Sequence, residues 1–278
     1  MIDVLLASYK PQPEYLASQI ESIRAQKDVE VKLIVREDVD GRGACANFAA
    51  LMEQSKSEYV AFSDQDDVWK DDKLSRMMVK MRELEARWGK DTPLLVFSDL
   101  TVVDADLKVL DESLFKRSRL IPDRILPRQL VLQNVANGNA MLFNAALREK
   151  ARPIPPEAVM HDSWVSLVAA VFGHSSCLNE STGFYRQHSE NVFGGPQIGI
   201  RYYLNRLMQG RKVVRERLYR HIHQAKAFVA RYGDTSPECI KALSQIENCP
   251  YLVRAYTLLR HRIFKTGFLR NLITLLTI

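Results

Sequence analysis

The sequence has few cysteines and lacks the arrangements that would give them a structural or metal-binding role. Four occur in 278 residues, and none forms a Cys-x-x-Cys pair or a Cys/His group with zinc spacing. No apolar run has the length of a membrane span, and the first residues form too short an apolar run for a signal peptide. These absences argue against a disulfide-bonded secreted scaffold and favour reduced thiols in a cytosolic protein.

Two common catalytic signatures are also missing. There is no phosphate loop of the Gly-Lys-Ser/Thr type and no Gly-x-Ser-x-Gly elbow. The run Gly41-Arg42-Gly43-Ala44-Cys45-Ala46 matches a dinucleotide fingerprint only superficially, because residues 36–40 separate it from the preceding strand.

The sequence does contain a dense carboxylate cluster. An apolar strand pattern over residues 59–63 leads directly into Asp64, Asp66 and Asp67. Because burying an unpaired carboxylate is costly, we expect all three acids to be exposed and to bind a cation. Oxygen ligands of this kind suit Mg²⁺ or Mn²⁺. An acidic surface turn is the other interpretation, since these residue types also favour turns.

Strand and helix patterns alternate around this cluster. Strands are predicted at 3–8, 31–35, 59–63 and 94–99, and helices near 16–23, 44–55 and 71–88. This alternation predicts an α/β fold with a mainly parallel central sheet, whose ligands lie beyond the carboxyl ends of the strands. We therefore expect the polar strand ends to converge on one edge: Ser8 and Tyr9; Glu37, Asp38 and Asp40; and the acidic cluster.

The pattern changes near residue 196, where glycines and a proline predict a domain boundary. Residues 197–278 are predicted to form a helical region, with helices near 200–232, 236–247 and 250–276. The net charge of +6 is concentrated here: residues 201–226 hold eight Lys/Arg and one acid, and residues 251–278 hold five and none. An anionic partner is expected for this region.

Several segments occur in an order that matches a known family. They are the block Phe62-Ser63-Asp64-Gln65-Asp66-Asp67-Val68-Trp69 with Lys73-Leu74, and then Leu5–Tyr9, Asn47-Phe48, Phe97-Ser98-Asp99, Gly138–Asn144, His161-Asp162-x-Trp164 and Tyr185-Arg186-Gln187-His188-x-x-Asn191. Over residues 1 to about 195 the chain resembles a family 2 glycosyltransferase of the GT-A fold, in the rhamnosyltransferase-like branch. The resemblance implies a GT-A-like nucleotide-sugar-binding domain at 1–196 and leaves 197–278 as an all-helical appendage.

The resemblance implies a divalent metal, Mn²⁺ or Mg²⁺, and a set of donor contacts. The implied metal ligands are Asp66, Asp64 and His188, although a lone histidine in a polar loop often has no special role. The implied contacts to the nucleotide-sugar donor are Ser8, Tyr9, Glu37, Asp38, Asp40, Asn47, Asp64, Gln65, Asp66 and Arg186. A cation there would stabilise the charge that develops on the leaving diphosphate. The glycines at 194 and 195 are a candidate hinge for a lid.

The resemblance also implies a catalytic base and an acceptor side. Asp162 corresponds to the base that takes the proton of the acceptor hydroxyl, although an Asp before a helix pattern can simply be an N-cap. Candidate acceptor contacts are Trp69, Gly138, Asn139 and Trp164. The two tryptophans are equally compatible with anchors in the core.

One departure from the family pattern concerns the donor edge. The segment between Asp40 and Asn47 is shorter than in the family, so Glu37, Asp38 and Asp40 are uncertain as nucleotide contacts. We expect an inverting transferase that moves a hexose or deoxyhexose, such as L-rhamnose from dTDP-rhamnose, onto a hydroxyl of a bacterial surface polysaccharide (an O-antigen, capsule or cell-wall glycan) or a lipid-linked glycan. The alternative is a weak or inactive nucleotide-sugar-binding subunit of an assembly complex.

The last residues suggest where such an enzyme would act. Residues 251–278 combine apolar side chains with five cations, as in helices that lie on anionic membranes. A helical cap packed on the catalytic domain is the other interpretation. Nucleic acid is not expected as a partner, because no reader motif accompanies the charge. The predicted location is cytoplasmic, with peripheral contact to the inner face of the plasma membrane.

Overall fold

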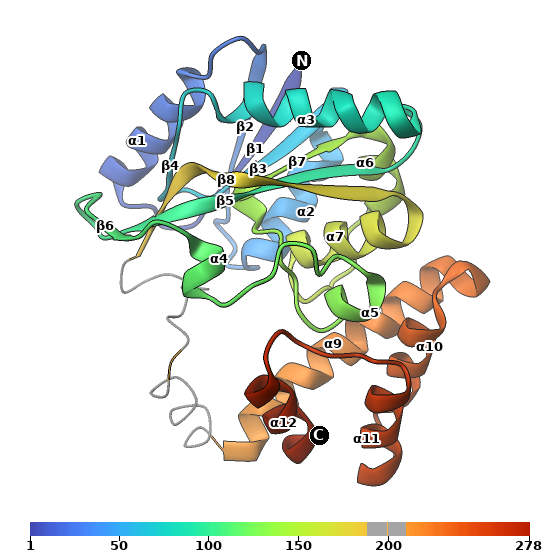
Figure 1. The fold of residues 1–278 in the computed structure, drawn as a ribbon. Coiled ribbons are helices and arrows are strands. Elements are labelled where there is room, and N and C mark those ends of the chain that lie inside the picture. Colours follow the sequence, from blue (N-terminus) through green and yellow to red (C-terminus); the bar gives the residue numbers. More distant parts are fainter. Residues whose placement is uncertain (188–198, 200–209) are drawn as a thin grey trace.

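A computed structural model describes residues 1–187, 199 and 210–278 of the chain (Figure 1). The strands are β1 (Ile2–Ser8), β2 (Val31–Glu37), β3 (Tyr59–Ser63), β4 (Val68–Trp69), β5 (Leu94–Val103), β6 (Val109–Asp111), β7 (Met141–Asn144) and β8 (His174–Arg186). The helices of the sheet-containing part are α1 (Pro13–Arg24), α2 (Ala44–Gln54), α3 (Lys73–Trp88), α4 (Leu114–Arg117), α5 (Pro127–Leu130), α6 (Ala145–Ala151) and α7 (His161–Phe172), with a 3-10 turn, η1, at Gly138–Ala140. The C-terminal helices are α9 (Gly210–Tyr232), α10 (Glu238–Gln245), α11 (Tyr251–Arg260) and α12 (Phe268–Thr277), with the 3-10 turn η2 at Gly233–Thr235.

The strands form one sheet in the order β2-β1-β3-β7-β5-β8-β4, with β6 paired to β5. The predicted α/β class is confirmed, but the sheet is mixed rather than mainly parallel. The pairs β1–β2, β1–β3 and β5–β8 are parallel, whereas β7 is antiparallel to both neighbours and β4 and β6 are also antiparallel. The short β7 is inserted between β3 and β5, and this interrupts the parallel arrangement.

The first three strands bring the predicted polar ends to one edge, as expected. Ser8 pairs with Glu37, and Leu6 pairs with Ser63, so β1, β2 and β3 end at nearly the same level. The Gln65 side chain then bridges two of these ends, because its Oε1 accepts from the Tyr9 N–H at 2.7 Å. Within the described residues, β2 is the last strand at this side of the sheet.

β1 is buried along its whole length, which explains its unbroken apolar sequence. Its residues alternate between two hydrophobic clusters: Val4 and Leu6 pack with α1 and α3, and Leu5 packs with α2 and α7. Helices therefore cover both faces of the sheet (Figure 1). In a sheet whose two faces are covered, the ends of the strands are the part left open to a ligand.

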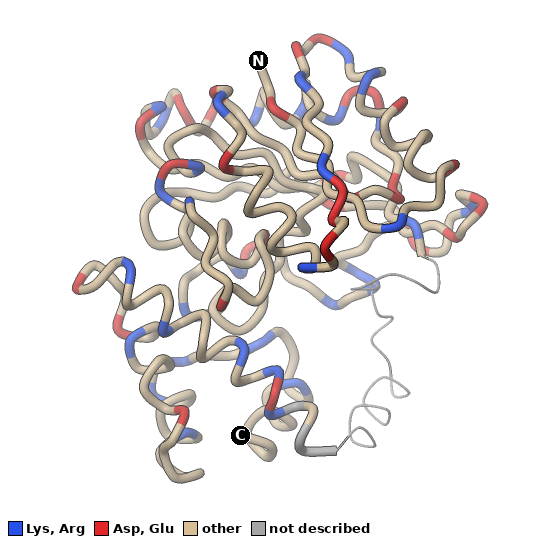
Figure 2. Tube along the Cα trace, turned by 180° about the vertical axis from the view of Figure 1, so that it is seen from behind, with Lys and Arg blue, Asp and Glu red and all other residues tan. Residues whose placement is uncertain are grey.

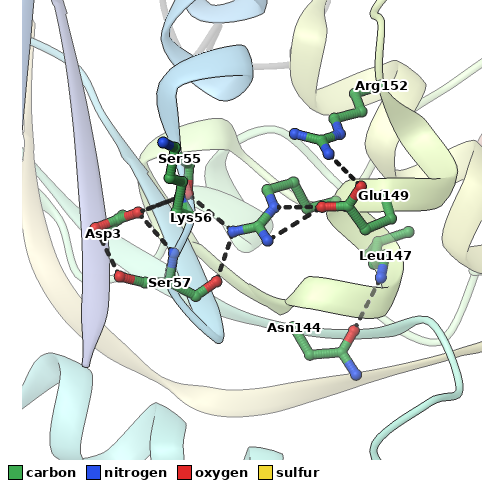
Figure 3. A network of polar contacts seen from close by, with 9 residues as sticks. Asp3, Ser55, Lys56, Ser57, Asn144, Leu147, Glu149 and Arg152 are labelled. Atoms are coloured by element: carbon green, nitrogen blue, oxygen red, sulfur yellow. Dashed lines mark hydrogen bonds and ion pairs between the residues drawn. The ribbon is translucent and has the colours of Figure 1, made fainter.

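The opposite end of β1 is held by a buried carboxylate network (Figure 3). Asp3 accepts hydrogen bonds from the Ser55 hydroxyl and from the Lys56 and Ser57 N–H groups at 2.8–3.0 Å. Arg148 of α6 donates to the carbonyl of Ser57 at 2.5 Å. These bonds tie the α2–β3 connection to β1 and α6, and so fix where β3 begins.

The C-terminal helices contact the sheet-containing part between Ser118 and Phe172. Phe228 of α9 is fully buried and contacts the ring of Trp164 at 5.6 Å between centroids. The Arg124 side chain donates to the Phe264 carbonyl at 2.6 Å, and the Gln133 side chain accepts from the Thr266 N–H at 2.6 Å. One hydrophobic cluster runs through both regions. The predicted boundary at 196 lies outside the described residues.

The helix predicted at 250–276 is two helices, α11 and α12, separated by residues 261–267. Arg262 and Gly267 have positive φ angles of 52° and 91°, which an α-helix does not allow. Periodicity alone did not reveal this break, because the apolar residues keep a helical spacing across it. None of the helices in the described ranges is long and apolar enough to cross a bilayer.

Candidate active site at the strand ends

The acidic cluster divides into a buried acid and two half-buried acids. Asp67 is fully buried, and its carboxylate accepts from the Asn139 amide at 2.5 Å and from the Arg186 N–H at 2.8 Å. This corrects the expectation that all three acids are exposed: hydrogen bonds satisfy Asp67, so it can be buried. Asp64 and Asp66 are half-buried, and they remain the candidate cation ligands.

A buried lysine, not assigned a role from the sequence, supports the cluster from behind. The Lys73 ammonium donates to the Asn139 carbonyl at 2.5 Å and lies 4.1 Å from the centre of the Trp69 ring. Burial lowers the pKa of Lys73 to about 7, against the opposing effect of the charges on Asp67 and Asp64. Its position at the start of α3, directly after the acids, is the signal that could have identified it.

Three of the predicted acceptor contacts are buried and form hydrogen bonds within the protein. Asn139 is 1% exposed and bridges Asp67 to the Trp69 indole N–H, which donates to its Oδ1 at 2.7 Å. Trp69 is 3% exposed. Trp164 is fully buried, and its indole donates to the Ala151 carbonyl at 2.8 Å. These side chains hold loops and helices together and present no face to a sugar.

Asp162 lies in the first turn of α7, and the N-cap of that helix is Met160. The Asp162 carboxylate accepts from the Gly138 N–H at 3.1 Å and from the Ser163 N–H at 2.5 Å. Burial raises the pKa of Asp162 to about 6, although these hydrogen bonds and one from the Asn134 side chain lower it. Asp162 is therefore not an N-cap, and its pKa suits proton transfer near neutral pH.

Asp162 and the acidic cluster meet at the η1 turn, because Gly138 donates to Asp162 and its neighbour Asn139 donates to Asp67. Burial, then the charge of Asp66, then that of Asp162 raise the pKa of Asp64 to about 7. The topology explains this meeting: the η1 turn leads into β7, which is paired with β3, and its Gly138 N–H holds Asp162. Carboxylates about a hundred residues apart in sequence thus converge at one edge of the sheet.

His161 precedes Asp162 and packs into the core beneath it. Its ring stacks on Phe48 at 3.8 Å between centroids, and neither ring nitrogen has a hydrogen-bond partner within the described part of the chain. Burial lowers the pKa of His161 to about 3, so the ring is neutral. A Cβ added at Gly138 would lie 2.8 Å from its Nε2, so the close approach of this turn to α7 requires glycine.

Two of the predicted donor contacts, Asn47 and Asp38, form hydrogen bonds that stabilise the fold. Asn47 is 1% exposed; its amide donates to the carbonyls of Ser8 and Arg36, and so it joins β1 to β2. Asp38 is 3% exposed and accepts from the N–H groups of Arg42 and Gly43, which closes the loop after β2. Both side chains are therefore buried and bonded within the protein, and their contact with a donor stays a prediction.

The remaining predicted donor contacts differ in their solvent exposure. Ser8 is buried and uses its carbonyl to accept from Asp38 and Asn47. The side chains at the edge that solvent reaches are half-buried Gln65 and exposed Tyr9, Glu37 and Asp40. Tyr9, half exposed at the end of β1, presents the only aromatic ring among the predicted donor residues.

Arg186 ends β8 directly beside the acidic cluster. Its guanidinium donates to the Asp66 carbonyl at 2.8 Å and to the Ala105 carbonyl, and it lies 4.2 Å from the centre of the Tyr15 ring. Arg186 is 3% exposed, and its bond to the Asp66 carbonyl holds the acidic loop in position. His188 and the candidate hinge at 194–195 lie outside the described residues.

The two half-buried acids fit a hard divalent cation. Asp64 and Asp66 offer carboxylate oxygens. The pKa of Asp64 is raised first by burial and then by the charges of Asp66 and Asp162, which a cation would offset. Over residues 1–187, 199 and 210–278 no group of three or more His, Cys, Asp or Glu side chains is arranged to hold a metal. A cation bound here would take its other ligands from water and phosphate, as Mg²⁺ usually does.

Comparison with known proteins supports the assignment of the fold. Residues 11–88 match the model of Glycosyl transferase family 2. The chain is 24% identical over 225 residues to an uncharacterized glycosyltransferase of Nostoc sp., covering 68% of this chain and 66% of the relative. That overlap spans slightly less than two thirds of the relative's length.

Solved structures of S. aureus TarS share the architecture. TarS 1–349 in complex with UDP aligns with a TM-score of 0.53 at 12% identity, over 99% of this chain and 89% of that one. TarS 1–349 in complex with UDP-GlcNAc aligns at 0.50 over 94% and 80%. The chain spans about half of the longer TarS structure, 48% of its length. The chain therefore has the GT-A fold of these glycosyltransferases, and its residues 11–88, which include the acidic cluster, match family 2.

Proposed function

We propose that the chain is a metal-dependent inverting glycosyltransferase that transfers a sugar from a nucleotide-sugar donor to a hydroxyl group. One observation supports this most directly. The loop that carries the half-buried Asp64 and Asp66 is bonded through Asp67 to Asn139, and the adjacent Gly138 binds a third carboxylate, Asp162. Burial raises the pKa of Asp162 to about 6. A cation-binding pair beside a separate base is what transfer from a nucleoside diphosphate requires.

Each carboxylate has its own role in the proposed reaction. Asp162 accepts the proton of the acceptor hydroxyl while the hydroxyl oxygen forms a bond to the anomeric carbon on the face opposite the diphosphate. The bond from that carbon to the diphosphate oxygen breaks, and the nucleoside diphosphate leaves with the electron pair. Asp64 and Asp66 would hold the divalent cation, which when bound supplies positive charge to the leaving phosphates. Gly138 holds Asp162 in place through its N–H.

The proposed donor is a nucleoside-diphosphate hexose or deoxyhexose. The motif resemblance favours L-rhamnose from dTDP-rhamnose, while TarS has been crystallised with UDP-GlcNAc. The proposed acceptor is a lipid-linked or oligosaccharide hydroxyl of a growing bacterial surface polysaccharide. The proposed place of action is the cytoplasmic side of the plasma membrane.

A second candidate is a subunit that binds nucleotide sugars and lacks transfer activity. The internal bonds of Asn47, Asp38 and Arg186 favour it, because they leave the donor edge with fewer side chains to contact a nucleotide. Such a protein would keep the acidic pair and lose turnover.

A donor screen separates the two candidates. Thermal shifts of the purified chain are measured with UDP-, dTDP- and GDP-sugars, each with and without Mn²⁺, followed by product analysis with lipid-linked acceptors. We expect one donor to stabilise the chain only with Mn²⁺, and Asp66→Ala to remove that shift. We expect Asp162→Asn to keep the shift and lower turnover by about 10²–10⁴-fold.

The control is Asp91→Asn, an exposed acid at the other end of the sheet, which should change neither quantity. Donor binding without product would favour the non-catalytic subunit. No metal-dependent shift with any donor, or full turnover in Asp162→Asn, would contradict the proposed enzyme.

A further inference from the structure

The last two helices have an unusual distribution of apolar side chains. In α11, Leu252, Tyr256 and Leu259 recur at helical spacing and are 76%, 62% and 51% exposed. A helix packed on a globular protein normally turns its apolar stripe to the core and its polar stripe to solvent. Here an apolar stripe faces outward.

α12 repeats this arrangement. Phe268, Leu272 and Leu276 follow one another at intervals of four residues and are 78%, 38% and 51% exposed. Leu269, 47% exposed, widens the stripe. Both helices lie at the end of the molecule far from the N-terminus and α3 (Figures 1 and 2). Apolar side chains that are exposed at helical spacing on both helices mark an interaction site.

The charge of this segment limits the nature of the partner. Residues 251–278 contain five Lys/Arg and no acid. Arg260 and Arg262, at the end of α11 and just after it, are exposed. A second copy of the chain would bring like charges together across the contact, whereas an anionic surface would neutralise them.

We propose that α11 and α12 dock the protein on an anionic lipid bilayer. The apolar stripes enter the boundary between headgroups and acyl chains, and Arg260 and Arg262 meet the lipid phosphates. The helices lie in the plane of the membrane surface and do not cross it.

The orientation of the sheet relates this surface to the candidate active site. β1 begins at the end of the molecule opposite to α11 and α12, so its carboxyl end points toward the helical region (Figure 1). Arg220 of α9 donates to the Val159 carbonyl at 2.6 Å, just before the start of α7, the helix that carries Asp162. The docking surface and the candidate site thus belong to connected parts of the chain; only the use of docking to reach lipid-linked acceptors depends on the proposed function.

Vesicle co-sedimentation of the full chain tests the docking surface. The probes are vesicles of phosphatidylcholine alone and vesicles that also contain phosphatidylglycerol. We expect binding to the anionic vesicles that falls with salt, and a loss of about tenfold or more in the pair Leu252→Ser with Phe268→Ser. The pair Arg260→Gln with Arg262→Gln should lose the preference for anionic vesicles and keep the residual apolar binding.

The matched control is Val79→Ser, an isolated exposed apolar residue of α3, which should bind like the wild type. All variants should keep the wild-type melting temperature, because the substituted side chains face solvent. The proposal would be overturned if the chain did not bind vesicles or bound neutral vesicles equally well. It would also be overturned if sedimentation velocity showed a dimer that the Leu252→Ser, Phe268→Ser pair converts to monomer. Transfer to a water-soluble acceptor, measured on the same variants, reports separately on the proposed function.

Discussion

Asp162 owes its properties to two opposing effects on a single carboxyl group. Burial disfavours the charged form, while the N–H groups of Gly138 and Ser163 stabilise it. Burial outweighs the hydrogen bonds, and the pKa of Asp162 is raised to about 6. A base of this strength is ionised at neutral pH and still accepts a proton readily.

This pKa predicts the pH dependence of the proposed transfer. Activity requires ionised Asp162, so the rate of the chemical step should rise about tenfold per pH unit below pH 6 and level off above it. The measurement is kcat/KM against pH with saturating metal. Because the folded pKa is raised, ionisation costs folding stability, and Asp162→Asn should melt at a higher temperature than wild type above pH 6.

The Asp91→Asn variant is the reference for both measurements and should reproduce the wild-type curves. A pH–rate profile that stays flat through pH 6 would rule out Asp162 as the titrating base.

The sequence led to Asp64, Asp66 and Asp162 through residue type and motif, and the structure brings these three together. The same reasoning proposed Asn139, Trp69 and Trp164 as acceptor contacts, and the structure buries them and gives them internal hydrogen bonds. A motif contains both the side chains that meet a substrate and those that hold them in place. Sequence spacing does not separate the two groups, because the direction of each side chain is decided by packing.

At the scale of elements, the start of β1 depends on one buried acid. Burial alone would raise the pKa of Asp3, but hydrogen bonds from Ser57, Ser55 and Lys56 together lower it. The carboxylate thus stabilises the fold when it is charged, and it links β1 to the α2–β3 connection (Figure 3).

Asp3→Asn should lower the free energy of unfolding at pH 7 by about 1–3 kcal/mol. The amide places N–H groups opposite the N–H and O–H donors whose hydrogen bonds the carboxylate accepts. Since the folded pKa is depressed, this stabilisation is present above pH 3.8 and is lost as the pH falls through the folded pKa. Urea titrations at pH 7 and at pH 3 measure the difference, which should shrink at the lower pH.

The exposed acid Asp106 provides the comparison, since Asp106→Asn should cost little at either pH. A loss in Asp3→Asn that is equally large at both pH values would mean that its charge is not what stabilises β1.

Strands and helices with clear periodicity were predicted well, whereas their directions and breaks were not. β1 and β3 were found within a residue of their ends. The antiparallel direction of β7 depends on its insertion between β3 and β5, which is a tertiary contact absent from its four-residue sequence. The break between α11 and α12 depends on backbone conformation at Arg262 and Gly267, which apolar spacing does not record.

At the scale of the whole molecule, the C-terminal helices and the sheet share one hydrophobic cluster. The sequence predicts an appendage, yet Phe228 of α9 packs against both Trp164 and Phe172 of α7. Leu218 and Ile222 of the same helix belong to the cluster that contains Leu5 of β1. A shared core of this kind predicts that the C-terminal helices and the sheet-containing part unfold together.

Phe228→Ala should therefore destabilise the entire chain by about 3–5 kcal/mol, because it leaves a cavity between α9 and α7. Phe268→Ala removes the same number of atoms from a side chain that is 78% exposed, and it should change stability little. Urea unfolding is followed by tryptophan fluorescence and by far-ultraviolet circular dichroism. The two signals should shift to lower urea together in Phe228→Ala. A fluorescence transition that stays at the wild-type midpoint while the helical signal moves would show instead that the C-terminal helices fold as a separate unit.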